Sequence, residues 1–201
     1  MSSTKLNLNF TLKITFCMTH LMKLRFDLLL INLILTTPIV ATEKTAVVIQ
    51  ADFGGAVMPG VVYNVSKDLN VFNINPLIPL YNIDAASRSL AYTAPYWPGG
   101  TVFVSVVDPG VGTPRKSVVL KTKSGHYFVT PDNGTLTNVA ELLGVAAMRE
   151  IDESVNRIKG SELSHTFHGR DVYSFTAGRL AAGVISYEQV GPLLKPEVVK
   201  L

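Results

Sequence analysis

The 201-residue chain has very little cysteine, because its single thiol is Cys17. One cysteine forms no intramolecular disulfide, and from residue 42 onward the sequence offers neither a thiol nucleophile nor a thiolate metal ligand. Redox chemistry at cysteine is therefore excluded for that part of the chain. Charge is also sparse: 16% of the residues are charged, whereas 47% are hydrophobic. This balance is typical of a globular domain with a substantial core and not of a disordered chain.

An excess of positive charge is missing from most of the chain. The net charge of +3 comes from the first 41 residues, which hold four basic residues and one acidic residue. From residue 42 onward, 14 basic and 14 acidic residues cancel. Nucleic-acid binding needs a basic surface, so we expect no nucleic-acid partner.

Residues 1–41 have the layout of a leader. Met22, a second candidate for the start of translation, opens a short basic stretch that is followed by an apolar run, Leu28–Leu35, and ends at Ala41. This is typical of a secretory signal peptide, and the run is short for a membrane span. We expect export, to a bacterial periplasm, with cleavage near Ala41 and no stable membrane span after processing. An uncleaved membrane anchor is the alternative.

From residue 45 onward, strand-like and helix-like runs alternate. The pattern predicts a layered α/β domain with a largely parallel central sheet flanked by helices. Strands are expected at 45–51, 70–74 and 101–107, a hairpin over 117–134 that turns at Ser124–Gly125, and helices at 83–94, 135–144 and 169–184. The apolar face of the last helix is expected to contain Val172, Phe175, Leu180 and Val184.

Four polar segments follow these runs, and in open α/β sheets ligands bind beyond the carboxyl ends of the strands. They are "ADFGG" (51–55), "VVDPGVGTPR" (106–115), "TPDNG" (130–134) and "TFHGRD" (166–171). In the second segment, prolines and glycines between Asp108 and Arg115 predict a stiff loop that brings carboxylate and guanidinium together. A purely structural ion pair is the alternative.

Metal and phosphate sites find little support. His165 and His168 have a spacing that two ligands on a helix use, but neither a cysteine nor an obvious third ligand accompanies them, so we predict no metal site. The "GVG" of the central loop lacks both the dinucleotide-binding pattern and the lysine of a phosphate-binding loop.

In this order and spacing, the four segments resemble the S-adenosylmethionine hydroxide adenosyltransferase family, which is also described as chlorinase/fluorinase-like. The resemblance covers roughly residues 45–194. It implies hydrolysis of S-adenosylmethionine to adenosine and L-methionine, with S-adenosylmethionine as substrate and no cofactor. The water-activating aspartate, arginine and histidine of the family fall on Asp108, Arg115 and His168. The substrate-binding positions of the family, one for the ribose and two for the nucleoside pocket, fall on Asp52, Asn133 and Phe167.

The same resemblance leaves two alternatives open. Family members that use a halide carry tyrosine where this chain has Asp108, and a carboxylate disfavours an adjacent anion, so water is expected over chloride or fluoride.

The family has a small β-rich second domain and places its site between the subunits of a homotrimer. On this basis, residues 42–190 correspond to the N-terminal domain and residues 191–201 to the start of a truncated second domain. A non-catalytic remnant or a nucleoside-binding module is then the second alternative. Pro59, at a position where the family has lysine, and "NPLIP" (75–79), in place of the family's "THEIP", also depart from its pattern.

Overall fold

The computed structural model describes residues 45–74 and 78–201. The expected leader, Cys17 and three residues of the "NPLIP" segment lie outside the described residues. In the part that is described, no helix combines the length and the apolar character needed to cross a membrane.

The described chain is built on one seven-stranded sheet with the strand order β2-β1-β3-β5-β4-β6-β7. The strands are β1 (Ala46–Ala51), β2 (Asn70–Asn73), β3 (Val102–Val106), β4 (Ser117–Thr122), β5 (Tyr127–Pro131), β6 (Val145–Glu150) and β7 (Leu193–Leu194). Strand β1 pairs in parallel with β2 and β3, and β3 pairs in parallel with β5. Strand β4 is antiparallel to both β5 and β6, so β6 runs in the same direction as β5. Five strands therefore end at the same edge of the sheet.

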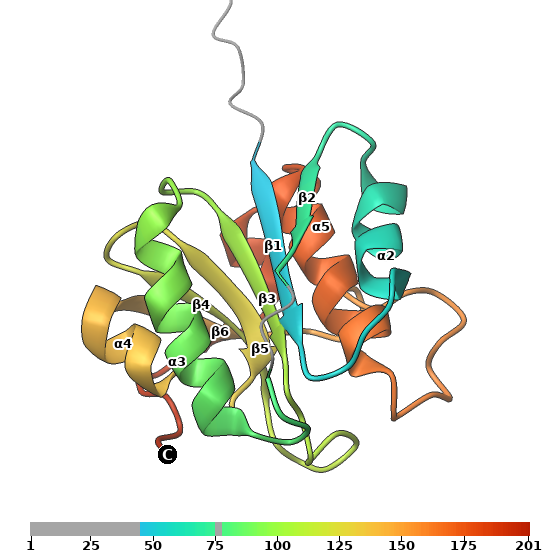
Figure 1. Ribbon diagram of the computed structural model, residues 1–201. Helices are drawn as coiled ribbons and strands as arrows, with labels where there is room; N and C mark the ends of the chain where they lie inside the picture. The colour runs from blue at the N-terminus through green and yellow to red at the C-terminus, as the bar shows by residue number, and fades with distance from the viewer. Residues whose placement is uncertain (1–44, 75–77) are drawn as a thin grey trace, which may run out of the picture. The chain divides into compact units, whose positions relative to one another are not determined.

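Helices cover both faces of this sheet (Figure 1). They are α2 (Val57–Val65), α3 (Ile83–Thr93), α4 (Thr137–Leu143) and α5 (Phe175–Ala181), which continues a π-helical segment η2 (Gly169–Ser174). Helices α3 and α4 pack on one face, with Leu90 and Val139 against Val48 and Phe103. Helices α2 and α5 cover the other face. The predicted α/β fold is confirmed.

The hairpin and the short helix after it are also confirmed. Strands β4 and β5 are joined at Ser124–Gly125, where Gly125 has a φ of +86° and donates its N–H to the carbonyl of Thr122 at 3.0 Å. Helix α4 ends at Gly144, whose φ is +65°. Both glycines occupy left-handed backbone, which other residues adopt only at a cost.

The helix predicted over 169–184 differs from the observed one. Its first part is π-helical and its last α-helical residue is Ala181, so Val184 lies beyond the helix and is 57% exposed. Phe175 and Leu180 are only half-buried, whereas Val172 is fully buried. A π-helical turn holds more residues than a turn of α-helix. The side chains that follow it therefore point in other directions than in a continuous α-helix. The predicted apolar face is therefore right at its first position and wrong at its end.

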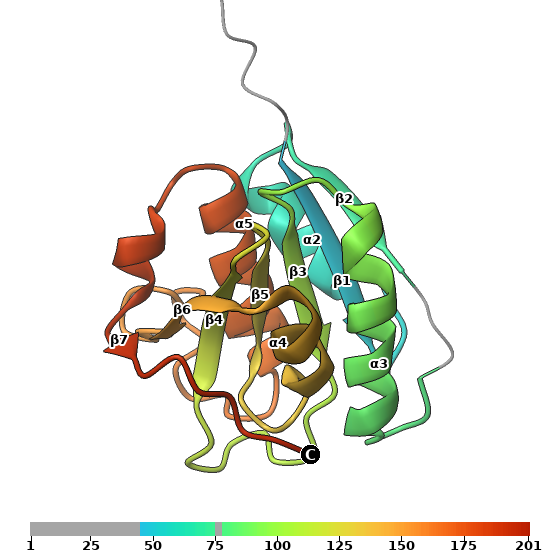
Figure 2. The same ribbon diagram turned by 90° about the vertical axis from the view of Figure 1, so that its left-hand side faces the viewer.

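The last residues of the chain lie against the same domain, as Figure 2 shows. Strand β7 pairs with β6 through Leu194 and Met148. Further along, the backbone N–H of Val199 donates to Asp132 at 2.9 Å, and Leu201 donates to the Thr137 hydroxyl at 3.1 Å. The assignment of residues 191–201 to the start of a second domain stays a prediction.

Candidate active site

Polar residues gather at the sheet edge where the parallel strands end. Asp52 follows β1, Asp108 follows β3, and Asn133 follows β5. Strand β4 runs the opposite way, so its first residue, Ser117, lies at this edge too. Glu153 follows β6, which also ends here. The topology therefore brings together side chains that are up to 101 positions apart in the sequence. This is the edge at which open α/β sheets bind ligands.

Asp108 and Arg115 form a bidentate ion pair. Arg115 donates from Nε to Asp108 Oδ1 at 2.9 Å and from Nη2 to Oδ2, while its Nη1 donates to the Ser117 hydroxyl at 3.0 Å. The side chains of Arg115 and Asp108 are only 11% and 4% exposed. Two parallel charge-assisted bonds fix both distance and orientation. The predicted approach of the two groups across the loop is confirmed.

The loop between them is held by turns and by a close contact. Val111 donates its N–H to the Asp108 carbonyl at 3.2 Å, and Thr113 donates to the Gly110 carbonyl at 3.1 Å. Gly112 has a φ of +80°, and a Cβ atom there would lie 3.0 Å from the backbone oxygen of His165. Glycine is therefore favoured on two grounds, and the loop packs closely against the segment that leads to His168.

His168 completes the predicted set of three. Its Nδ1 lies 3.1 Å from Arg115 Nη2, and the ring is only 7% exposed. Burial is the main cause that lowers its pKa; the charges of Arg115 and Arg157 add to this effect, while Glu153 and Asp108 oppose it. This environment favours the uncharged imidazole.

A cavity of about 440 Å³ opens beside this cluster. It lies between the segments that follow β1 and β3 and the segment 166–170, and its wall includes Asp52, Asp108 and Phe167. Arg115 and His168 are not among its lining residues; Arg115 is linked to the cavity wall by its bonds to Asp108, and His168 lies next to Arg115. Gly169 also lines it, and a Cβ atom there would lie 3.1 Å from a methyl group of Val106.

Asp52, which the sequence predicts as the ribose-binding residue, is held by an unusual turn. Its Oδ2 accepts the N–H of Tyr81 at 2.6 Å, and Tyr81 has a φ of 63°, the positive-φ conformation that glycine normally adopts. The aromatic rings of Phe53, Tyr81 and Phe167 line the cavity and are each half-exposed or more. Exposed rings around a concave site offer stacking surfaces for a planar ligand.

Asn133 has a different environment. Its amide donates to the Val107 carbonyl at 2.9 Å, and its Oδ1 accepts from the backbone N–H and the hydroxyl of Thr135. It holds the end of β3 against the turn after β5 and is not among the residues that line the cavity. Its expected contact with a nucleoside stays a prediction.

Sequence reasoning missed four members of the cluster: Ser117, Glu153, Arg157 and Tyr173. Arg157 lies 3.1 Å from the second ring nitrogen of His168 and pairs with Glu153. The hydroxyl groups of Ser117 and Tyr173 are 3.2 Å apart. Because β6 was not predicted, nothing in the sequence indicated that the residues after it reach this edge.

Within residues 45–74 and 78–201, no group of three or more histidine, cysteine, aspartate or glutamate side chains is placed to hold a metal ion.

These observations define an α/β domain with a small-molecule cavity at the carboxyl edge of its sheet and a buried carboxylate–guanidinium pair whose carboxylate lies in the cavity wall. The chain belongs to the SAM hydroxide adenosyltransferase family, whose N-terminal domain matches residues 47–191. The predicted family is thereby confirmed.

Similar proteins carry two kinds of name. The chain is 41% identical over 144 residues to an (R)-S-adenosyl-L-methionine hydrolase of Methanocaldococcus jannaschii, with 67% of this chain and 52% of that protein covered. It is 23% identical over 163 residues to a fluorinase of an Actinoplanes species, with 70% and 54% covered. A crystal structure of an uncharacterized conserved protein from Thermotoga maritima has a TM-score of 0.72 and 37% identity, covering 78% of this chain and 60% of that one. The chain thus spans about half the length of the curated relatives it matches.

Proposed function

We propose that this chain carries the reaction centre of an S-adenosylmethionine hydrolase, in which water attacks the ribose C5′ and yields adenosine and L-methionine. The observation that carries the proposal is the buried Asp108–Arg115 pair, with its carboxylate in the wall of the cavity. The hydrolase names of relatives that are 33–41% identical support the same substrate.

The chemistry makes its main demand on the nucleophile. The C5′–S bond of a sulfonium breaks with its electron pair going to sulfur, so the leaving group is a neutral thioether and needs no general acid. Water is a poor nucleophile, since its pKa is about 15.7. The positive charge of Arg115 stabilises negative charge that develops on the attacking oxygen. Asp108 accepts a hydrogen bond from the water. As the C5′–O bond forms, one hydrogen stays on the new 5′-hydroxyl, and the other passes as a proton to the Asp108 carboxylate and from there to solvent.

The cavity fits the rest of the substrate by size and by lining. Its volume of about 440 Å³ lies within the range of about 300–1,000 Å³ that is usual for small-molecule sites. The carboxylate of Asp52 can accept hydrogen bonds from ribose hydroxyls, and the exposed ring of Phe167 can stack on a base. Two carboxylates and several aromatic faces also suit a positively charged sulfonium.

The halide reaction is the second candidate, and the structure disfavours it. A halide at the position of the attacking water would lie next to the Asp108 carboxylate, and like charges at close range repel strongly in a buried site. The relatives named fluorinase are also more distant, at 23–24% identity.

Incubation of the purified chain with S-adenosylmethionine, with and without chloride, tests the proposal by mass spectrometry. Adenosine and methionine in equal amounts, formed at a rate that chloride does not change, are the expected products. 5′-Chloro-5′-deoxyadenosine would indicate a halogenase instead. The same assay is run on the chain alone and on the chain joined to the remaining part of the Methanocaldococcus jannaschii relative. If both bind adenosine in calorimetry but neither turns over S-adenosylmethionine, the chain is a nucleoside-binding module.

Export and assembly are further parts of the proposal. The leader-like composition of residues 1–41 supports secretion of a chain that begins near Thr42. N-terminal sequencing of the secreted protein checks this, and a mature protein that begins at Met1 or Met22 would contradict it. The resemblance to the family supports a homotrimer, which native mass spectrometry detects directly; a monomer at micromolar concentration would contradict it.

A further inference from the structure

His168 lies between two arginines, and this arrangement is not explained by the reaction alone. Arg115 Nη2 is 3.1 Å from its Nδ1, and Arg157 Nη2 is 3.1 Å from its Nε2. A guanidinium donates hydrogen bonds and never accepts them. A neutral imidazole has one nitrogen that accepts and one that donates, so it can satisfy only one of the two arginines at a time. The fold therefore has to select one tautomer.

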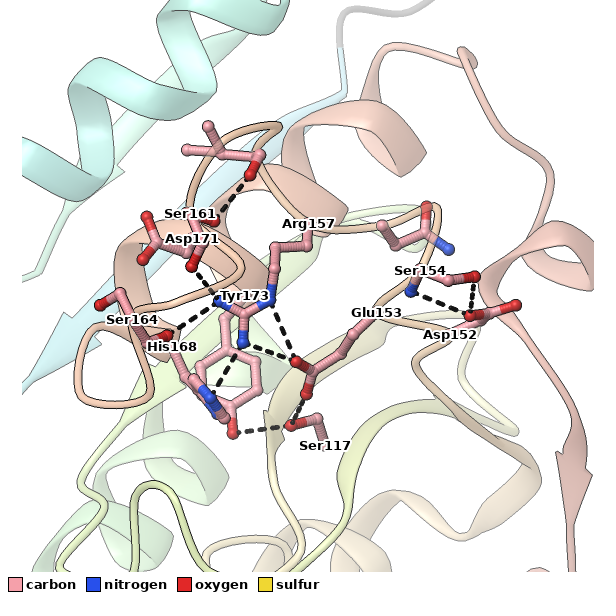
Figure 3. A network of polar contacts seen from close by, with 12 residues as sticks. Ser117, Asp152, Glu153, Ser154, Arg157, Ser161, Ser164, His168, Asp171 and Tyr173 are labelled. Atoms are coloured by element: carbon pink, nitrogen blue, oxygen red, sulfur yellow. Dashed lines mark hydrogen bonds and ion pairs between the residues drawn. The ribbon is translucent and has the colours of Figure 1, made fainter.

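Arg157 is held from several sides, by Glu153, by the segment that contains Ser161 and Ser164, and by His168 (Figure 3). Its Nε and Nη2 donate to Glu153 Oε2 at 3.2 and 2.7 Å, and its Nη1 donates to the carbonyls of Ser161 and Ser164, both at 3.1 Å. The remaining N–H, on Nη2, faces His168 Nε2. All five N–H groups of Arg157 thus have an assigned partner, and its side chain is only 7% exposed.

Arg115 depends less on the histidine. Its Nε and Nη2 already hold both oxygens of Asp108, and its Nη1 donates to Ser117. Its side chain is somewhat more exposed than that of Arg157, and it is next to Asp108, which lines the cavity. A donor that loses its partner costs most where it is most buried. Acceptance by Nε2 leaves all five N–H groups of Arg157 with a partner, whereas Arg115 keeps its bonds to Asp108 and Ser117 without the histidine.

We propose that Arg157, clamped by Glu153 and two backbone carbonyls, is a positioning residue that holds His168 as the neutral tautomer with its proton on Nδ1. His168 then presents an N–H beside Arg115, which holds the cavity-lining Asp108, and the histidine does not act as the proton acceptor. This role rests on the proposed function. The tautomer itself does not, since it follows from the contacts of the folded chain.

Nitrogen NMR of the full chain labelled with ¹⁵N reads the tautomer directly. The signals of His168 are assigned by their loss in His168→Asn. We expect a protonated Nδ1 and an unprotonated Nε2 at pH 7.5. A protonated Nε2, or protonation of both nitrogens, would overturn the proposal.

Variants of Arg157 and Glu153 should shift the pKa of His168 in opposite directions, which a merely structural role would not do. Arg157 lowers the pKa of His168 and Glu153 raises it. Arg157→Gln should therefore make the imidazole titrate at higher pH than in the parent, Glu153→Gln should make it titrate at lower pH, and Arg157→Lys should remain nearer the parent. Arg88→Gln is the matched control, because Arg88 also pairs with an acid four residues earlier but on an exposed helix surface. If the pKa of His168 shifts in the same direction in Arg157→Gln and Glu153→Gln, the proposed role of Arg157 is wrong.

Kinetics separate this inference from the proposed function. In a preparation that hydrolyses S-adenosylmethionine, Arg157→Gln should lower kcat by about tenfold, as one lost hydrogen bond in the transition state would, and should leave KM nearly unchanged. An unchanged kcat would overturn the positioning role. The parent can show the expected tautomer, and the Arg157 and Glu153 variants opposite pKa shifts of His168, while no preparation hydrolyses S-adenosylmethionine. In that case the proposed function fails and the tautomer assignment stands.

Discussion

Replacement of Asp108 by asparagine tests the reaction centre with the smallest change of shape. Asparagine keeps one oxygen that can accept from Arg115 Nε, but its amide nitrogen would face Arg115 Nη2, so a charge-assisted bond becomes a contact between two donors. The guanidinium, 11% exposed, would also lose its counter-charge. Breaking a buried ion pair by removing one partner costs about 3–5 kcal/mol, and the residual hydrogen bond of asparagine places this variant at the lower end of that range.

The effect on catalysis should exceed the effect on binding. The water loses the acceptor that orients it, and Arg115 loses the group that fixes its position, so hydrolysis should fall by about 10²-fold or more. 5′-Deoxyadenosine lacks the oxygen that the attacking water delivers, so its affinity in calorimetry should stay within about threefold of the parent. Asp84→Asn, on an exposed helix surface, is the control. A folded Asp108→Asn variant that turns over S-adenosylmethionine at the parent rate would remove Asp108 from the mechanism.

Three further predictions concern the scaffold. Gly169→Ala should reduce the free energy of unfolding by about 1–3 kcal/mol in urea titrations, because its Cβ would lie 3.1 Å from Val106 and 3.2 Å from the sulfur of Met58; an unchanged midpoint would contradict this close packing. Gln50→Leu should cost a similar amount, about 1–3 kcal/mol, because the amide of Gln50 is fully buried and bonds to a backbone carbonyl and a serine hydroxyl at 3.0 and 2.8 Å; equal stability would refute it. The lowered pKa of His168 means that the unfolded chain binds the proton more readily, so stability should decrease as pH falls below about 6.5; urea titrations should show a weaker pH dependence for His168→Gln than for the parent, and an equal dependence would contradict the prediction.

The elements that the sequence predicted correctly have strong local signals. The continuous apolar run of β3 indicated a strand covered on both faces, and its five residues are all buried. Helix α2 was missed because Pro59 and Gly60 look like helix breakers. Pro59 is in fact the third residue of the helix, where its missing N–H has no intrahelical partner to lose.

Strand β6 was missed for the opposite reason. Its sequence, "VAAMRE", is rich in residues that favour helix, and its extended form comes from pairing with β4 and β7. That omission hid Glu153 and Arg157, which follow β6. Asp108 and Arg115 were found because a stiff loop joins them in the sequence, whereas the Arg157–His168 contact depends on how two separate segments return to one sheet edge. Local chemistry is visible in the sequence, and contacts set by topology are not.

The central claim, that water attacks C5′ of S-adenosylmethionine at the Asp108–Arg115 pair, is tested most directly by reaction in H₂¹⁸O. The chain, alone and joined to the remaining part of the Methanocaldococcus jannaschii relative, is incubated with S-adenosylmethionine, and the adenosine is analysed by mass spectrometry. The account predicts ¹⁸O in the 5′-hydroxyl of adenosine, with methionine free of label, and loss of this product in Asp108→Asn. Adenosine without ¹⁸O at the 5′ position, or no adenosine from either preparation, would contradict it.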